Sequence, residues 1–178
     1  MRTVPRACRA ALAAAATMLV LAGCLPSSPR GGDDVEELSA ALSDIPGVAT
    51  GEVRLDVWTN GFTQNRTAVV IVEVDPGATL GVSEAEALEY FLRVGWAVNE
   101  GEPNEVIVVA VRDAAGTQLA WDVEAAAAEL GLVDSVSVRE DSTSIWFDRR
   151  GEPTGLSEFL GPWPGEPPTP PDGLFTTG

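Results

Sequence analysis

The hydrophobic and polar positions of this 178-residue chain follow two periods. Apolar residues recur every three to four positions, the spacing of an amphipathic helix, in three segments: 33–45, 83–96 and 122–131. Alternation of apolar and polar residues, or a short unbroken apolar run, predicts strands in six segments: 53–57, 67–74, 106–111, 117–121, 133–138 and 145–147. The run at 106–111 is apolar throughout, which indicates a central strand buried on both faces.

Turn and capping residues delimit these segments. Pro46-Gly47 ends the first helix, and Asn60-Gly61 is a hairpin signal between the first two strands. Ser83 with Glu86 forms a capping box that opens the second helix. Asp122 caps the alanine-rich third helix, and Gly131 stands where a helix commonly ends in a left-handed residue.

The order of these elements predicts an α+β fold. From the second strand onward it is β-α-β-β-α-β, the ferredoxin-like plan of two split βαβ units. This plan places the helices on one face of an antiparallel sheet. An extra helix and strand precede it, within residues 33–57, and we expect one domain spanning residues 33–150.

The composition changes at residue 151. Residues 151–178 contain seven prolines and six glycines without a periodic pattern, which predicts a flexible tail. Truncation after Arg150 should then be tolerated. Phe159, Leu160 and Trp163 are unusual in such a tail, and we expect them to rest on the domain, with binding to a partner as the alternative.

The N-terminal residues have the pattern of an export signal. Arg2, Arg6 and Arg9 precede an apolar segment, 10–20, that is too short for a stable membrane span. Leu21-Ala22-Gly23-Cys24 follows and resembles the lipobox of bacterial lipoproteins. The resemblance implies that residues 1–23 are a signal peptide removed by a signal peptidase that recognises Leu21, Ala22 and Gly23. It also implies a diacylglyceryl group on Cys24, with residues 24–32 as a tether.

The charge restricts the partners. The chain has a formal charge of −16, with 11 basic and 27 acidic residues. Three of the basic residues precede Cys24 and all the acidic ones follow it, so the mature chain would carry −19. Such a surface repels nucleic acids and anionic headgroups, so membrane attachment is expected through the lipid, whose two acyl chains suffice for stable anchoring.

The residue types present exclude much catalytic chemistry. The chain has no histidine or lysine, and its cysteines are Cys8 and Cys24. Ser-His-Asp triads, Schiff-base lysines and Cys/His zinc sites are therefore excluded, and we expect no cofactor or metal. Carboxylate pairs remain, and two sets lie near strand ends: Glu73 with Asp75, and Glu140 with Asp141 and Asp148.

Aromatic residues are the candidate partner contacts. Trp58 and Phe62 flank the predicted Asn60-Gly61 turn, and Trp163 lies in the predicted tail. For Trp58 we expect packing on the domain, with exposure at the loop tip as the alternative. Residues 106–138 also faintly resemble the second half of BON-type envelope domains, which implies phospholipid contact. The central glycine pattern of that family is absent after Asp113, and the acidic charge opposes such contact.

The sequence thus predicts a lipid-anchored protein on the extracytoplasmic face of the cell membrane. We expect a non-enzymatic binding or scaffolding module that contacts another envelope protein. The alternative is a carboxylate-dependent hydrolase acting on cell-wall glycan. An enzyme would need a cleft with two acids roughly 5 to 10 Å apart, whereas a binding module would show an exposed apolar or aromatic patch.

Overall fold

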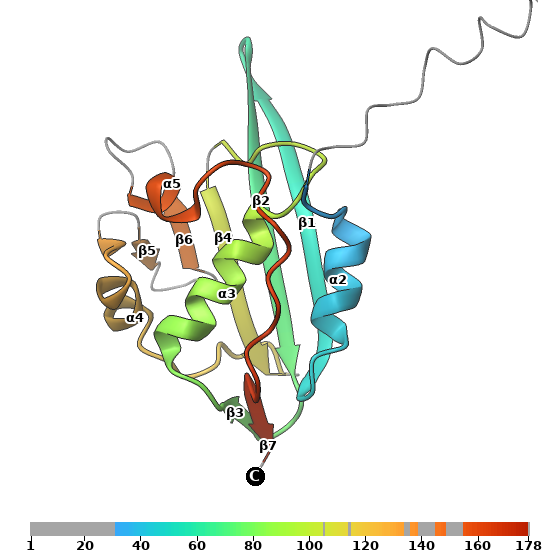
Figure 1. Ribbon diagram of the computed structural model, residues 1–178, viewed down its shortest axis with the longest axis vertical. Helices are drawn as coiled ribbons and strands as arrows, with labels where there is room; N and C mark the ends of the chain where they lie inside the picture. The colour runs from blue at the N-terminus through green and yellow to red at the C-terminus, as the bar shows by residue number, and fades with distance from the viewer. Residues whose placement is uncertain are drawn as a thin grey trace, which may run out of the picture. The chain divides into compact units, whose positions relative to one another are not determined.

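The computed structural model describes residues 31–104, 106–113, 115–133, 136–138, 145–148 and 155–177 (Figure 1). The predicted signal peptide and lipobox residues Leu21, Ala22, Gly23 and Cys24 lie outside these ranges. The helices are α2 (Val35–Ser43), α3 (Glu84–Trp96), α4 (Val123–Glu129) and α5 (Gly155–Leu160). The strands are β1 (Val48–Asn60), β2 (Thr63–Val74), β3 (Ala78–Leu80), β4 (Val106–Asp113), β5 (Val136–Val138), β6 (Ile145–Asp148) and β7 (Phe175–Thr177).

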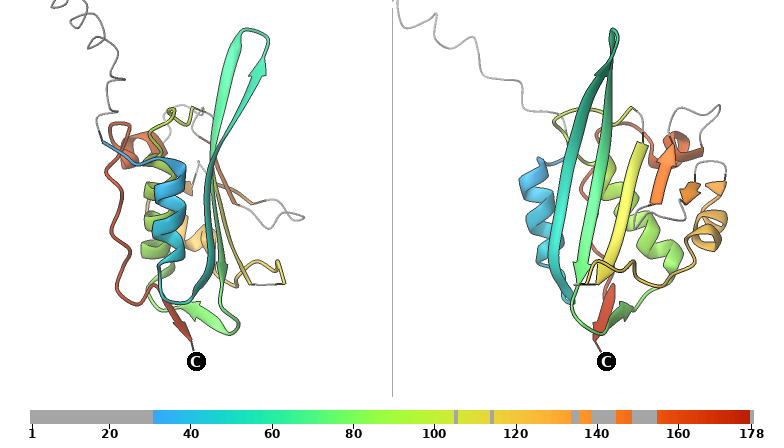
Figure 2. Two further views of the ribbon diagram at one scale, coloured as in Figure 1. Left: turned by 90° about the vertical axis from the view of Figure 1, so that its right-hand side faces the viewer. Right: turned by 180° about the vertical axis from the view of Figure 1, so that it is seen from behind.

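Five of the described strands form a mixed sheet with the order β1-β2-β4-β6-β5. β1 pairs with β2, β6 with β4, and β5 with β6, all antiparallel, whereas β2 and β4 run parallel. Helices α2 and α3 lie on one face of this sheet (Figure 2). The sheet is therefore a layer of an α+β fold, as the sequence predicts.

β2 and β4 run parallel, and two neighbouring parallel strands need a long crossover connection. Helix α3 lies within this connection. The predicted capping box is present: the backbone N–H of Glu86 donates to Ser83 Oγ over 3.2 Å. The inner residues of the helix are buried, with Leu88, Phe91 and Leu92 fully inaccessible to solvent. Capping and hydrophobic period therefore predict α3 correctly.

The ferredoxin-like plan is not confirmed, because β2 and β4 are direct neighbours in the sheet. A split βαβ unit needs another strand between them, and the sequence assigned residues 117–121 to that strand. These residues instead form one bridge, between Arg112 and Gln118, beside a turn at the end of β4. The helix and strand predicted before this unit are α2 and β1, and β1 is an integral edge strand that pairs along β2.

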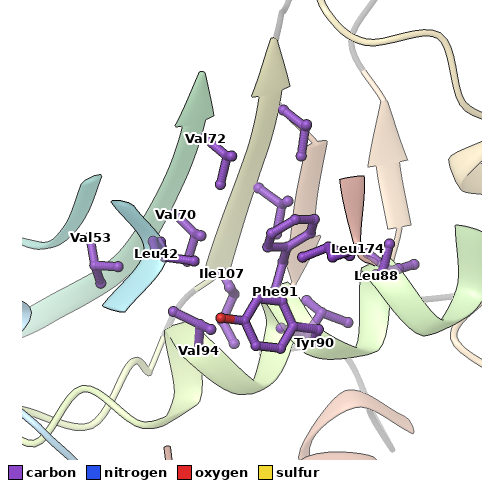
Figure 3. Packing of buried hydrophobic residues seen from close by; sticks show 14 of the residues in the cluster. Leu42, Val53, Val70, Val72, Leu88, Tyr90, Phe91, Val94, Ile107 and Leu174 are labelled. Atoms are coloured by element: carbon purple, nitrogen blue, oxygen red, sulfur yellow. The ribbon is translucent and has the colours of Figure 1, made fainter. Parts of the chain in front are cut away.

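The main core lies between the sheet and the helices (Figure 3). Val53 of β1, Val70 and Val72 of β2, and Ile107 of β4 contribute side chains that are at most 3% exposed. Residues 107–111 of β4 are all buried, which confirms the prediction of a central strand covered on both faces. Leu42 brings α2 into the same cluster.

The prediction of a flexible tail is wrong for residues 155–177, which pack on the domain. Leu156, Leu160, Leu174 and Phe175 are each at most 5% exposed and belong to the main core. The whole stretch from Gly31 to Gly178 forms one compact unit, so the domain does not end at residue 150. Prolines remove helical and sheet periodicity, but they do not prevent an extended segment from burying the apolar residues between them.

Backbone hydrogen bonds hold this C-terminal segment across α3 (Figure 1). Gly165 N–H donates to the carbonyl of Trp96, and Gly81 N–H donates to that of Leu174. β7 then pairs with β3 in a two-stranded antiparallel sheet, at the end of the domain opposite to the β1–β2 turn (Figures 1 and 2). Residues 161–177, named here the strap, therefore form an outer layer over α3.

Candidate contact surface on the β1–β2 hairpin

The two longest strands form a hairpin that extends beyond the rest of the sheet (Figures 1 and 2). β1 and β2 pair without interruption from Thr50 with Glu73 to Asn60 with Thr63, but β2 pairs with β4 only from Thr67 onward. Thr67 lies opposite Asp56, so four further residue pairs precede the turn, and Gly61 at the tip is the fifth residue after Asp56. At about 3.3 Å per residue, the hairpin projects about 17 Å past the last pair that β4 supports.

The turn lies one residue later than Asn60-Gly61 alone predicts. Asn60 pairs with Thr63, which makes Gly61 and Phe62 the two central residues. Gly61 has a φ of +63°, whereas no described non-glycine residue has a positive φ. Glycine at the first central position followed by an ordinary residue is the pattern of a type II′ turn. The turn therefore places Phe62 at the very tip.

The projecting part of the hairpin is uncharged and carries exposed apolar side chains. Phe62 is 110% exposed relative to its reference state, Val57 is 51% exposed and Trp58 is 43% exposed. Among the described residues only one other large hydrophobic side chain, Val133, is exposed to this degree. Residues 57–65 contain no charged side chain, although the whole chain carries −16. We call residues 57–65 the tip segment.

Charge returns immediately below the tip segment. The guanidinium of Arg54 lies 3.0 Å from a Glu52 carboxylate oxygen and 3.1 Å from one of Asp56. The hydrogen bond to Glu52 is the main reason that the pKa of Arg54 is raised; partial burial opposes this effect, and Asp56 adds to it. These surface ion pairs contribute little to stability. They show that the base of the hairpin is charged, whereas the tip segment is not.

Helix α2 covers the lower part of the β1 edge with two serine hydroxyls. The backbone N–H of Val53 donates to Ser39 Oγ over 2.8 Å, and that of Gly51 donates to Ser43 Oγ over 3.0 Å. Ser39 and Ser43 are one helical turn apart, a spacing of about 6 Å that fits alternate residues of a strand. The edge groups of Gly51 and Val53 are thereby satisfied.

Gly51 allows this close approach. A Cβ at this position would lie 2.4 Å from Leu42 Cβ and 2.8 Å from the backbone nitrogen of Ser43. The helix would then have to move away from the strand, and the serine hydroxyls would move with it. The missing side chain of Gly51 is therefore part of the edge protection.

Asn104 covers the opposite edge of the hairpin, above β4. The N–H of Arg66 donates to Asn104 Oδ1 over 2.7 Å, and Asn104 Nδ2 donates to the carbonyl of Gln64 over 2.9 Å. The backbone N–H of Asn104 also donates to the carbonyl of Arg66. One side chain thus replaces the neighbouring strand that this part of β2 lacks.

The upper β1 edge has no such cover. Because Gly51 and Val53 point their backbone groups away from β2, the regular register gives Val57 and Thr59 the same outward direction. Within the described ranges, no helix or side chain satisfies these groups as the serines do lower down. The uncovered edge and the exposed aromatic residues therefore coincide in the tip segment.

The third predicted contact residue, Trp163, lies in a different place. Its indole nitrogen donates to the carbonyl of Val98 over 3.0 Å, and its ring packs against the main core. Trp58 and Phe62 therefore both lie in the tip segment, whereas Trp163 fastens the strap to the domain.

The structure describes the side chains of only one of the two predicted acidic sets, Glu73 with Asp75. Glu73 Oε1 lies 2.9 Å from the guanidinium of Arg112 on the adjacent strand, an ion pair across β2 and β4. Glu140 and Asp141 lie outside the described residues, as does the side chain of Asp148. Within the described residues, no cluster of three or more acidic, histidine or cysteine side chains is placed to hold a metal ion.

A second feature is a cavity of about 710 Å³ beside the start of α4, lined by residues 118–124. Two acidic residues line it, Asp122 and Glu124. Asp122 accepts a hydrogen bond from Ala125 N–H and thus caps the helix. The indole nitrogen of Trp121 is buried without a hydrogen-bond partner in the described structure. The sequence gives no signal for this cavity, because it depends on where the 117–121 segment lies.

No helix in the described ranges is both long and apolar enough to cross a membrane. Comparison with known proteins finds no matching family model, curated protein or solved structure.

Proposed function

We propose that this protein is a lipid-anchored, non-enzymatic binding or scaffolding module on the extracytoplasmic face of the cell membrane. Its contact surface is the tip segment, which meets another component of the envelope. The observation that carries the proposal is the projecting hairpin, whose Val57, Trp58 and Phe62 are exposed in an otherwise strongly acidic chain.

The exposure of these side chains supports a contact role rather than a structural one. Most large apolar side chains of the domain are buried, and an aromatic residue held in water at the end of a hairpin gives no packing energy to the fold. Aromatic side chains supply much of the contact energy in interfaces, because they bury a large area and lose little conformational entropy. The rigid sheet below holds them in a fixed position.

The anchor rests on the sequence of the N-terminal residues. The lipobox-like Leu21-Ala22-Gly23-Cys24 follows a basic and then an apolar segment, and the domain begins within ten residues of Cys24. The test is to replace Cys24 with alanine, or to inhibit lipoprotein signal peptidase with a globomycin-type compound. Either change should leave unprocessed or detached protein, and unchanged processing and membrane fractionation of Cys24→Ala would refute the anchor.

The contact surface is tested separately by removing its aromatic side chains. The double variant Trp58→Ser/Phe62→Ser should reduce crosslinking of the chain to other envelope components, measured on crosslinked membranes, without lowering its melting temperature. The matched control is Val133→Ser, because Val133 is 60% exposed but lies outside the hairpin. Equal crosslinking of the double variant, the control and the unaltered chain would refute the tip segment as the contact surface.

A further inference from the structure

We propose that the tip segment contacts the membrane itself, placing Trp58 and Phe62 in the headgroup region of the leaflet that holds the lipid on Cys24. This inference rests on the lipid anchor proposed above and names the envelope component that the tip meets. The domain would then be attached at two points, the lipid and the hairpin. A two-point attachment fixes its orientation, with the β3–β7 end directed away from the bilayer.

The direction of the chain supports this arrangement. Asp33 N–H donates to the carbonyl of Ala97, and Asn99 N–H donates to that of Asp33. The same loop, residues 97–104, ends at Asn104, which covers the hairpin edge at Arg66. The described chain therefore begins at the end of the domain from which the hairpin projects (Figure 1).

The lengths agree with contact. Seven residue steps separate Cys24 from Gly31, so a fully extended tether spans at most about 25 Å. The hairpin projects about 17 Å from the sheet on the same side, at 3.3 Å per residue. A domain held within reach of the lipid therefore brings the hairpin tip close to the bilayer surface.

The charge pattern makes the tip the part of the domain best suited to this contact. Residues 57–65 are uncharged, while the chain as a whole carries −16. Electrostatic repulsion from anionic headgroups is screened over about 8 Å at physiological ionic strength. The turn lies about 17 Å beyond Asp56, twice that distance, so Phe62 can touch the surface while the acidic body stays outside the range of repulsion. Trp58 is only two residues from Asp56, or about 7 Å, and therefore marks the limit of the contact.

The side chains and the backbone of the hairpin determine how deeply its tip can enter the bilayer. Tryptophan and phenylalanine partition into the membrane interface, where the apolar rings are sheltered and the indole N–H keeps polar partners. The backbone groups of Val57 and Thr59 have no cover on the outer edge, and unpaired backbone groups do not enter the hydrocarbon core. The structure thus fits shallow insertion of the hairpin end, from the turn down to Trp58, into the headgroup region and not into the hydrocarbon core.

The test uses the lipidated mature chain in vesicles of phosphatidylcholine and phosphatidylglycerol. Cys8 leaves with the signal peptide and Cys24 carries the lipid, so an introduced cysteine is the one free thiol of the mature chain. An environment-sensitive fluorophore on Thr63→Cys reports on the tip, and the same label on Thr177→Cys reports on the opposite end. The readout is quenching by nitroxide-labelled lipids.

We expect quenching severalfold stronger at position 63 than at position 177. Adding Trp58→Ser and Phe62→Ser should lower the position 63 signal to that of position 177. Raising the salt concentration should not weaken the quenching, because no ion pair holds the tip. Equal quenching at both positions, or full quenching in the serine variant, would overturn the inference.

Mass spectrometry of the Cys24 peptide separates the two proposals. A lipidated chain whose tip is not quenched would refute membrane contact and leave the anchor standing. A chain without lipid would refute the anchor itself. A tip that crosslinks to a protein in cells but is unquenched in pure vesicles would also refute this inference, and would assign the surface to a protein partner.

Discussion

Truncation after Arg150 should unfold the protein, although the composition of residues 151–178 alone predicts tolerance. The deletion removes four side chains that are at most 5% exposed: Leu156, Leu160, Leu174 and Phe175. Burial of each contributes about 1.5–3 kcal/mol, or about 6–12 kcal/mol together. This loss is as large as the whole stability of a typical domain, about 5–15 kcal/mol.

Single substitutions measure the same effect in a folded protein. Leu174→Ala should cost about 2–5 kcal/mol, which corresponds to a melting temperature about 4–20 °C lower for a chain of this size. Thr169→Ala, at an exposed position of the strap, is the matched control and should change stability by less than about 0.5 kcal/mol. Thermal and urea unfolding, followed by circular dichroism, provide both values.

The reasoning would be refuted if the truncated chain kept a cooperative transition within about 1 kcal/mol of the full chain, since the lost burial is far larger. Equal effects of Leu174→Ala and Thr169→Ala would point to the same conclusion. Either result would mean that the strap lies on the domain without stabilising it.

Three further predictions concern α2, the β1 edge and the single tyrosine. Gly51→Ala should destabilise the domain by at least about 2 kcal/mol in urea unfolding, because its Cβ would overlap Leu42; a neutral effect would refute the close approach of α2. Ser39→Ala should cost about 1–3 kcal/mol by leaving Val53 N–H without a partner, and a cost equal to that of an exposed alanine substitution would contradict this role. Burial raises the pKa of Tyr90 to about 12. Its folded pKa lies above the unfolded value near 10, so its contribution to stability is complete below about pH 10 and is lost between about pH 10 and 12. Absorbance titration of this single tyrosine should therefore show a midpoint near pH 12, whereas a midpoint near 10 in the folded chain would contradict its burial.

Local signals in the sequence predict the elements better than their arrangement. The capping box at Ser83 and the apolar run 106–111 place α3 and β4 correctly, because capping and burial are set by residues close in sequence. The pairing of β2 with β4 is decided by the crossover through α3 and by the 117–121 segment staying outside the sheet. That choice depends on contacts between distant residues, so element order alone suggests a ferredoxin-like plan.

The sequence predicted that apolar residues such as Leu160 and Trp163 rest on the domain, but it missed the strap as a part of the fold, for a related reason. Leu160, Leu174 and Phe175 enter the core at positions that follow no regular spacing. An extended segment rich in proline and glycine has no helical or strand period, so the pattern of apolar residues does not reveal its packing. Apolar residues in a proline-rich segment were the one available signal. They indicate packing only when a groove on the folded domain accepts them.

The candidate contact surface was predicted in part. The hairpin signal at Asn60-Gly61 placed Trp58 and Phe62 beside a turn, since turn chemistry is local, but the expected packing of Trp58 on the domain is wrong, because its side chain is exposed. The length of the projection and the covered edges were not predicted, because Ser39 and Asn104 act on strands distant in sequence. Trp163 was grouped with the hairpin aromatics by residue type alone, and the structure separates them.

The central claim is that the anchored domain meets the envelope through the tip of its hairpin. The most direct measurement places the photo-crosslinking residue p-benzoylphenylalanine at position 62 in intact cells, and at position 177 as the control on the opposite end. The account predicts adducts of the membrane-bound chain from position 62 and none from position 177. Adducts of equal yield from both positions, or from position 177 alone, would contradict it.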